Sequence, residues 1–265
     1  MPDRKYTQQT VINVKHWVPQ KLMSITTTCD PAFTFTAGQF ARLGLPAAEA
    51  DALPSIWRAY SMVNAPGHDT LEFYSVVVPE GEFSPRFARL TPGDAIYIDK
   101  TAFGFLTLDR FEKGGQLWLL ATGTGLSAYM SLLQDHNTWT SFDQIILVHG
   151  VRKINELAYQ DQLNDWAKTG LAPAQSDAPP RARFTYLPIP TQESLPNTPR
   201  GRITALLENG QLEAHAGSFL DPAHAKVMLC GNPDMLSHAR KLLSERGFAV
   251  GRRGNPGNLA VENYW

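Results

Sequence analysis

The stretch LWLLATGTG, residues 117–125, is an apolar run that ends in a glycine turn. An apolar run without alternating polar residues is typical of a strand that is covered on both faces. Residues 126–133 follow the glycines with a helical pattern, so the sequence predicts a strand, a tight turn and a helix. This order is typical of a parallel sheet, whose ligands bind where the strands end.

The same combination of apolar run and helix occurs twice more along the chain. Strands that alternate with helices predict a doubly wound α/β fold with a parallel sheet and right-handed crossovers. We place this domain at residues 113–265, because the pattern begins near the glycines at 114 and 115. The expected strands are 117–121, 145–148 and 226–230, and the expected helices are 126–133, 156–168 and 234–245.

The N-terminal part of the chain has a different pattern. Short apolar runs are divided by clusters of Pro, Gly and Asp, and a single short helix is expected from Ser84 to Leu90. Six strands at this spacing predict a small antiparallel β-barrel. The length of 265 residues suits two domains, and we place the barrel at residues 1–112. The expected barrel strands are 11–17, 22–28, 39–45, 60–63, 71–78 and 94–98.

Composition and charge exclude several classes of protein. The net charge is −1, without long runs of either sign, so no nucleic-acid binding is expected. Cys29 and Cys230 are too few for a four-thiolate iron–sulfur cluster or a disulfide scaffold, and no metal site is expected. The first residues are polar, so no signal peptide is expected. Two glycines interrupt the most apolar stretch, so no membrane span is expected there. We expect a cytoplasmic protein that does not contact membranes, with loops over 170–182 and 188–200.

Two glycine turns are candidates for phosphate binding. Gly123 lies between a buried strand and a helix, and Gly231, followed by Asn232 and Pro233, lies in the same position after the last predicted strand. Glycine lets the backbone approach a pyrophosphate, which the N–H groups at a helix start attract. Turns at strand ends of one sheet would face the same crevice. The alternative is that the glycines only permit tight turns, because the full G-x-G-x-x-G spacing is absent.

A second candidate set, Arg58-Ala59-Tyr60-Ser61, lies at the start of a predicted barrel strand. The arginine could clamp a phosphate, the tyrosine could stack on a planar ring and the serine could hydrogen-bond to that ring. The alternative is an ordinary edge strand, since arginine and tyrosine are common on sheet surfaces. These four residues do not decide between the two interpretations.

Five motifs occur in order along the chain. They are Arg58-Ala59-Tyr60-Ser61, Gly81-Glu82-Phe83-Ser84-Pro85, Gly123-Thr124-Gly125, Cys230-Gly231-Asn232-Pro233 and Val261-Glu262-Asn263-Tyr264-Trp265. Together they resemble the ferredoxin–NADP reductase family, and the chain is most similar to the bacterial branch whose chains end in Tyr-Trp. The resemblance implies an N-terminal FAD-binding barrel and a C-terminal NADP-binding α/β domain.

The resemblance also implies binding residues for both nucleotides. The FAD pyrophosphate would be held by Arg58, the flavin ring would lie between Tyr60 and Tyr264, and Trp265 would stack on the adenine. The implied FAD residues are Arg58, Ala59, Tyr60, Ser61, Tyr74, Ser75, Val76, Val77, Glu82, Phe83, Ser84, Thr124, Tyr264 and Trp265. The implied NADP residues are Gly123, Arg152, Thr191, Gln192, Arg202, Gly231, Asn232 and Pro233.

Three residues are implied in catalysis. Ser61 would lie near flavin N5, Cys230 near the nicotinamide, and Tyr264 would have to move aside for the nicotinamide. For Cys230 a purely structural role as a buried apolar residue stays open. The chain departs from the family pattern at Ala128, where proline is common, and at Gln192, where an arginine helps to clamp the 2'-phosphate. Glutamine supplies no charge, so a weakened preference for NADP is expected.

The implied function is electron exchange between NADPH and a ferredoxin or flavodoxin, which are acidic one-electron carriers. A flavin connects the two because it accepts a hydride and releases electrons singly. We expect a monomer. One alternative is an NAD(P)H-dependent flavin reductase, or another reductase of the same fold with a different acceptor. Another is a nucleotide-binding module without catalytic activity, which the yellow colour of bound FAD would exclude.

Overall fold

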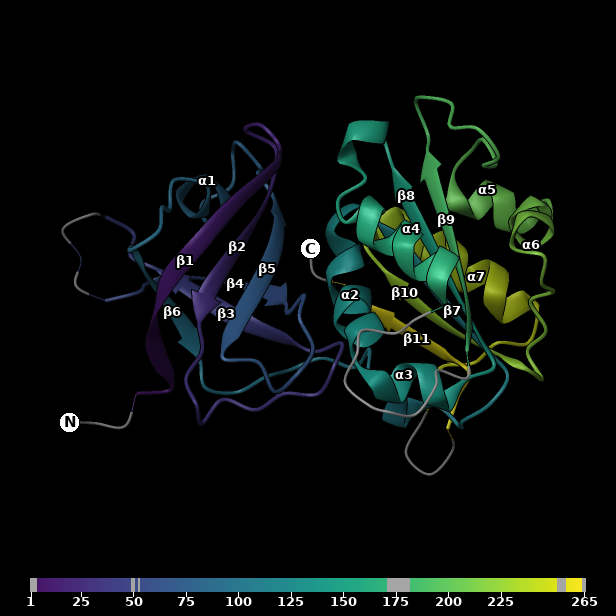
Figure 1. Cartoon of the computed structure of the whole chain (residues 1–265), viewed down its shortest axis with the longest axis horizontal. Coiled ribbons are helices and arrows are strands. Elements are labelled where there is room, and N and C mark those ends of the chain that lie inside the picture. Colours follow the sequence, from purple (N-terminus) through teal and green to yellow (C-terminus); the bar gives the residue numbers. More distant parts are fainter. Residues whose placement is uncertain (1–3, 49–50, 52, 171–181, 252–255, 264–265) are drawn as a thin grey trace.

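The computed structural model describes residues 4–48, 51, 53–170, 182–251 and 256–263. Figure 1 shows two sheets side by side, the N-terminal one in purple and blue and the C-terminal one in teal to yellow. The order of elements along the chain explains this division, because strands dominate the first part and alternate with helices in the second. The two-part architecture predicted from the sequence is confirmed.

The N-terminal sheet is antiparallel and has the order β4-β3-β6-β1-β2-β5. A bridge between Met62 and Phe73 joins the two ends of this order, so the sheet closes into a barrel. Its interior is filled by apolar side chains such as Met23, Ile25 and Leu43, together with Phe87 of the short helix α1. The elements are β1 (Tyr6–Val18), β2 (Leu22–Thr28), β3 (Phe40–Leu45), β4 (Ile56–Ser61), β5 (Thr70–Val76), α1 (Ser84–Phe87) and β6 (Ala95–Asp99).

The C-terminal sheet is parallel and has the order β11-β10-β7-β8-β9. The chain runs outward from β7 to β9 and then returns to place β10 on the other side of β7, which makes a topological switch point between β7 and β10. The strands are β7 (Gln116–Thr122), β8 (Gln144–Val151), β9 (Arg183–Pro190), β10 (Ala225–Cys230) and β11 (Leu259–Glu262). The helices are α2 (Leu126–Gln134), α3 (His136–Ser141), α4 (Gln160–Thr169), α5 (Ile203–Glu208), α6 (Gln211–Ala216) and α7 (Pro233–Glu245), with 3-10 turns at Leu108–Arg110, Gly123–Gly125 and Ile154–Glu156.

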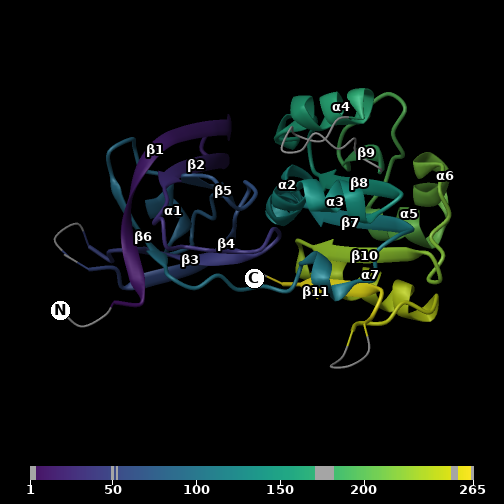
Figure 2. The same ribbon diagram turned by 60° about the horizontal axis from the view of Figure 1, so that its bottom comes forward.

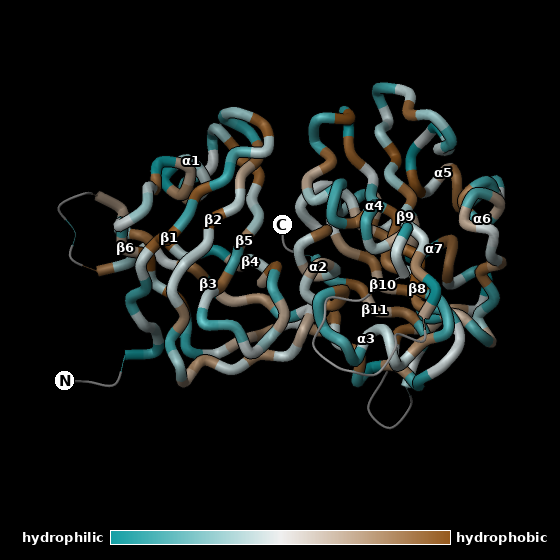
Figure 3. Tube along the Cα trace, viewed as in Figure 1, coloured by the Kyte–Doolittle hydropathy of each residue, from teal (hydrophilic) through white to brown (hydrophobic). Residues whose placement is uncertain are grey.

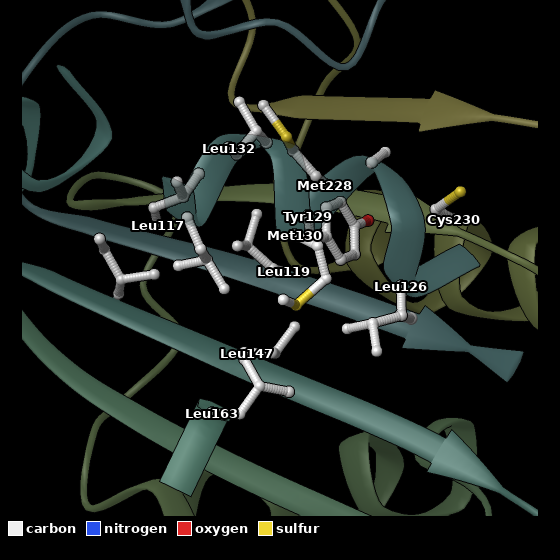
Figure 4. Packing of buried hydrophobic residues seen from close by; sticks show 14 of the residues in the cluster. Leu117, Leu119, Leu126, Tyr129, Met130, Leu132, Leu147, Leu163, Met228 and Cys230 are labelled. Atoms are coloured by element: carbon white, nitrogen blue, oxygen red, sulfur yellow. The ribbon is translucent and has the colours of Figure 1, made fainter. Parts of the chain in front are cut away.

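Helices cover both faces of the parallel sheet, as Figure 2 shows with α2 and α4 on one side and α7 on the other. One core cluster joins the sheet to α2 and α4, and Figure 4 shows part of it around Tyr129 and Met130. The second cluster joins the opposite face to α5, α6 and α7. The hydrophobic segments in Figure 3 accordingly follow the strands of this sheet. Burial on both faces explains why its central strands are continuous apolar runs.

The first core cluster also reaches into the barrel, where it includes Leu22 and Tyr74. Several hydrogen bonds cross the same interface, and three of them involve residues of α2 or the residue before α4. Ser131 Oγ donates to the Asn64 carbonyl at 2.8 Å, Gln134 Nε2 donates to the Val63 carbonyl at 2.8 Å, and Tyr159 Oη donates to Glu72 Oε1 at 2.7 Å. The two sheets are therefore held together by packing and by hydrogen bonds on the side of α2 and α4.

Several predicted boundaries were wrong. Strand β4 covers Ile56–Ser61 rather than residues 60–63, so Arg58 and Tyr60 lie within it. The short helix α1 ends at Phe87 rather than at Leu90. Helix α4 begins at Gln160 rather than at Glu156, because Ile154–Glu156 form a separate 3-10 turn and Tyr159 has a left-handed backbone with φ of 60°.

The loop predicted over residues 188–200 was wrong for its first three residues, which complete β9. Two prolines suggested a loop, but β9 is the edge of its sheet, and proline is tolerated at an edge because one side of the strand needs no hydrogen-bond donor. Strand β11 and helices α3, α5 and α6 were not predicted. Among the described residues, none of the helices combines the length and the apolarity needed to cross a membrane.

Candidate functional site

A cleft of about 640 Å³ opens at the carboxyl ends of β7, β8, β9 and β10 and is closed on its other side by the barrel. This is the place where a doubly wound sheet binds its ligands. Lys21, Leu22, Tyr74 and Val76 line it from the barrel. The lining from the α/β part is Thr122, Gly123, Thr124, Gly150, Val151, Arg152, Glu156, Thr191, Gln192, Arg202, Ile203, Thr204, Asn232, Asp234, Met235 and His238.

The two glycine turns pack directly against each other at the floor of this cleft. A Cβ added at Gly125 would lie 2.6 Å from the carbonyl oxygen of Cys230, and one added at Gly231 would lie 2.2 Å from Thr122 Oγ1. That same Thr122 hydroxyl accepts a hydrogen bond from the Asn232 N–H at 2.8 Å. Glycine is therefore required for close packing at both positions. Gly123, with φ of 55°, has open space where a side chain would stand, which leaves room for a ligand.

His149 holds the first glycine turn through a hydrogen bond to Gly123. It is fully buried in β8, and its Nε2 lies 3.1 Å from the Gly123 carbonyl oxygen, so this nitrogen is the donor. Its Nδ1 is buried without a hydrogen-bond partner among the described residues. Burial lowers the pKa of His149 to about 4, despite the opposing effect of the Gly123 carbonyl. The imidazole is therefore neutral at physiological pH and fixes the orientation of the Gly123 peptide.

The residues predicted to clamp the 2'-phosphate lie together at the ends of β8 and β9. The Gln192 N–H donates to the Arg152 carbonyl at 2.9 Å, and the Thr191 N–H donates to the Val151 carbonyl at 2.9 Å. Arg202 stands at the start of α5 on the same side of the cleft. The side chain of Arg152 is 60% exposed, so its guanidinium is available to a ligand.

Sequence reasoning missed an ion pair in this cleft, between Lys21 and Glu156. Lys21 is the last residue of the β1–β2 turn, and its Nζ forms an ion pair with Glu156 Oε1. Glu156 Oε2 accepts a hydrogen bond from the Arg152 N–H at 3.0 Å. Burial raises the pKa of Glu156, but the hydrogen bonds from Lys21 and Arg152 outweigh it and lower this pKa below its ordinary value. No motif marks either residue, and 134 residues separate them in the sequence.

The predicted FAD residues of the barrel gather around β4 and β5. Ser75 Oγ and Tyr60 Oη are 3.2 Å apart, and the Tyr60 ring stacks on Phe87 at 5.2 Å. Ser84 Oγ accepts from the Val78 N–H at 2.9 Å, which ties the start of α1 to the end of β5. Phe83 is buried in the barrel core, whereas Glu82 is exposed.

Two further features of the barrel suit a flavin nucleotide. The hydroxyl of Tyr74 is buried at the cleft without a hydrogen-bond partner among the described residues, so a bound ligand could supply one. Burial raises the pKa of this hydroxyl strongly, so it remains a neutral hydrogen-bond donor. Arg58 is exposed on β4, and none of the described carboxylates forms an ion pair with it. The residues present therefore fit FAD.

Two of the residues predicted to be catalytic, Ser61 and Cys230, do not line the cleft. Ser61 and Cys230 are both buried, at the ends of β4 and β10. Burial raises the pKa of the Cys230 thiol well above its ordinary value, which keeps it protonated. Glu262, which pairs with Cys230 across β10 and β11, accepts a hydrogen bond from the Phe105 N–H at 2.9 Å. Tyr264 and Trp265 lie outside the described residues.

The structure brings many of the predicted site residues to one cleft but leaves others outside its lining. Those that line it are Tyr74, Val76, Gly123, Thr124, Arg152, Thr191, Gln192, Arg202 and Asn232. Those that do not are Arg58, Ala59, Tyr60, Ser61, Ser75, Val77, Glu82, Phe83, Ser84, Cys230, Gly231 and Pro233. In the second group, Arg58, Ala59, Tyr60 and Ser61 lie on β4, Ser75 lies on β5 and Ser84 begins α1.

Comparisons with known proteins agree with this architecture. The family model of the oxidoreductase NAD-binding domain matches residues 119–241. Ferredoxin–NADP reductase A of Sorangium cellulosum (strain So ce56) is 39% identical over 97% of this chain and 89% of its own. The flavodoxin/ferredoxin–NADP reductase of Escherichia coli (strain K12) is 37% identical over 96% of this chain and 97% of its own.

A solved structure is also similar over the full length. The crystal structure of a ferredoxin NADP+ reductase from Neisseria gonorrhoeae with bound FAD and NADP has a TM-score of 0.89 and 32% identity, and the match covers 99% of this chain and 100% of that one. Identity above 30% to relatives that are matched over nearly their whole length establishes the family. The chain belongs to the ferredoxin/flavodoxin–NADP reductase family of oxidoreductases.

Proposed function

We propose that this protein exchanges electrons between NADPH and a one-electron carrier, ferredoxin or flavodoxin, with FAD as the resident cofactor. In the direction of NADPH oxidation, one NADPH gives NADP+ and one proton, and two carrier molecules each gain one electron. The cleft carries this proposal, because it joins glycine turns and cations of the parallel sheet to the barrel face of Tyr74.

The α/β part binds and orients the NADPH. Gly123 leaves space for a pyrophosphate above the start of α2, and His149 holds the Gly123 peptide in place. Arg152 and Arg202 attract the 2'-phosphate at the ends of β8 and β9, with Thr191 and Gln192 as hydrogen-bonding partners. Placing the nicotinamide beside the flavin makes hydride transfer effectively intramolecular.

The barrel binds the flavin nucleotide and excludes water. We assign Arg58 to the pyrophosphate, Tyr60 to the flavin ring and Ser61 to its reactive edge. The buried hydroxyl of Tyr74 donates to the ligand from the cleft wall. When bound, FAD supplies the chemistry that accepts a hydride and releases electrons singly.

Reduction of the purified protein tests the proposed function. NADPH should bleach the flavin absorbance, and addition of ferredoxin or flavodoxin should restore it while the carrier is reduced. If flavins serve as well as these carriers, the alternative of a flavin reductase is favoured. A protein without a flavin spectrum that binds NADPH would instead be a nucleotide-binding module.

Replacing Arg58 by alanine is expected to lower FAD occupancy. The lost charge-assisted phosphate contact is worth about 1.5 to 3 kcal/mol, or roughly 10- to 150-fold in the dissociation constant of FAD. Flavin content per chain after dialysis and titration of the apoprotein with FAD both measure the effect. Arg89, an exposed arginine after α1, provides the control as Arg89→Ala and should leave occupancy unchanged. Full occupancy in Arg58→Ala would remove Arg58 from the FAD site.

Finer properties belong to the same proposal. We place the FAD-binding domain at residues 1–112 and the NADP-binding domain at 113–265, and we propose a cytoplasmic monomer. The residues Tyr264-Trp265 support the proposal that the chain belongs to the branch of the family that ends in Tyr-Trp. Tyr264 would cover the flavin face that the nicotinamide needs and would move aside, and Cys230 would stand near the nicotinamide.

A further inference from the structure

The cleft contains a cation that does not come from the nucleotide-binding motifs. Lys21 is the last residue of the turn between β1 and β2 of the barrel, and it lines the cleft together with Arg152, Gln192 and Arg202 of the α/β part. The resemblance implies an arginine where this chain has Gln192, and the Gln192 amide supplies no charge to a phosphate. Lys21 reaches the same region from the opposite domain.

Glu156 connects Lys21 to this clamp. One of its oxygens pairs with Lys21 Nζ and lies 3.6 Å from Arg152 Nε, and the other accepts the Arg152 N–H at 3.0 Å. Arg152 in turn accepts the backbone N–H of Gln192 at 2.9 Å. Lys21 is therefore separated from Arg152 by a single carboxylate, and Arg152 is the direct neighbour of Gln192.

We propose that Lys21 is a specificity-determining residue that binds the 2'-phosphate of NADPH together with Arg152 and replaces the charge missing at Gln192. This inference rests on the proposed function, because it concerns the nucleotide of that reaction. It goes further by assigning nucleotide selectivity to a barrel residue.

Lys21 and Arg152 retain donors for a phosphate while they contact Glu156. An ammonium group has three N–H donors, and a guanidinium group has five. Glu156 engages one donor of Lys21, whose side chain remains 33% exposed, and the Arg152 side chain is 60% exposed. The charged side chains that line the cleft are Lys21, Arg152 and Arg202 against Glu156 and Asp234, which leaves a net charge of +1. Glu156 thus positions both cations without cancelling their attraction for a phosphate.

A purely structural ion pair between the domains is the competing explanation. A partly exposed ion pair contributes little to stability. Loss of such a pair would affect NADPH and NADH alike, because both nucleotides share every group except the 2'-phosphate. The ratio of kcat/KM for NADPH to kcat/KM for NADH therefore separates the two explanations.

The test compares Lys21→Gln with wild type as holoenzymes. We expect kcat/KM for NADPH to fall roughly 10- to 150-fold, the equivalent of one charge-assisted hydrogen bond of about 1.5 to 3 kcal/mol. We expect kcat/KM for NADH to stay within about twofold, as for a surface substitution. Calorimetric titration provides a readout without turnover: binding of 2'-AMP should weaken and binding of 5'-AMP should not. Lys21→Arg should retain the wild-type kcat/KM for NADPH and the wild-type affinity for 2'-AMP.

Lys15→Gln is the matched control, since Lys15 is an exposed lysine of β1 whose Nζ lies over the Trp17 ring and does not line the cleft. It should behave as wild type. A second arm uses Gln192→Arg, which should change the NADPH to NADH ratio little in wild type, where Lys21 supplies the charge. In the Lys21→Gln background, Gln192→Arg should restore most of the lost preference.

Equal losses for NADPH and NADH in Lys21→Gln would overturn the assignment in favour of a structural ion pair. An unchanged ratio, or 2'-AMP binding as in wild type, would overturn it as well. Failure of the proposed function itself would look different, because the wild-type protein would then oxidise neither nucleotide. The 2'-AMP titration would still report on Lys21 in that case.

Discussion

Replacing Gly231 by alanine is expected to destabilise the protein by about 2 to 5 kcal/mol and to weaken NADPH binding. Gly231 has φ of 131°, and an added Cβ would lie 2.2 Å from Thr122 Oγ1 and 2.7 Å from the Thr122 carbonyl oxygen. The unfavourable backbone conformation costs about 1 to 2 kcal/mol and overpacking another 1 to 3 kcal/mol. Because the backbone atoms of Thr122 belong to β7, they cannot move aside without displacing the glycine turn.

Gly217→Ala is the matched control for this substitution. Gly217 also has a positive φ, 61°, but nothing lies within 4 Å of an added Cβ there. The control therefore isolates the backbone cost, expected at about 1 to 2 kcal/mol, from the steric clash. Urea unfolding measures the free energy of unfolding of both variants, and titration with NADPH measures their affinity for the nucleotide. Equal destabilisation of Gly231→Ala and Gly217→Ala would show that the turns do not pack as described.

The local sequence was sufficient to predict the strands that are buried on both faces of the parallel sheet. Strands β7, β8 and β10 are covered on both faces, so their apolar runs were recognised, and their alternation with helices predicted a parallel sheet. Strand β9 escaped recognition because its prolines are tolerated only at an edge position, which no local pattern shows. Helices α5 and α6 have six residues each, too short for a clear helical period.

The site was predictable to the extent that motifs mark it. The two glycine turns were expected to face one crevice because parallel strands end at the same edge of their sheet, and the structure packs these turns against each other. The binding roles of the site residues stay predictions. Lys21 and Glu156 could not be predicted. Their contact depends on how the barrel sits against the parallel sheet, which is a property of the packed tertiary structure.

His149 is expected to make the protein sensitive to acid. Its pKa is about 4 in the folded protein and 6.5 is the ordinary value, so the unfolded chain takes up a proton at a higher pH than the folded one. Stability from this residue is therefore complete above pH 6.5 and is lost as the pH falls toward 4. At 1.36 kcal/mol per pKa unit, the loss amounts to about 3 kcal/mol in the free energy of unfolding.

The variant His149→Gln tests this expectation, because its amide can still donate to the Gly123 carbonyl but does not titrate. Urea unfolding between pH 7 and pH 4 should show a loss that is smaller by about 3 kcal/mol than in wild type. His68, exposed between β4 and β5, provides the control, and His68→Gln should follow the wild-type profile. His149→Leu should weaken NADPH binding at neutral pH, since it leaves the Gly123 carbonyl without its donor. Identical pH profiles for His149→Gln and wild type would contradict the neutral, buried state of this imidazole. If His149→Leu binds NADPH as tightly as wild type, the glycine turn keeps its shape without the His149 hydrogen bond.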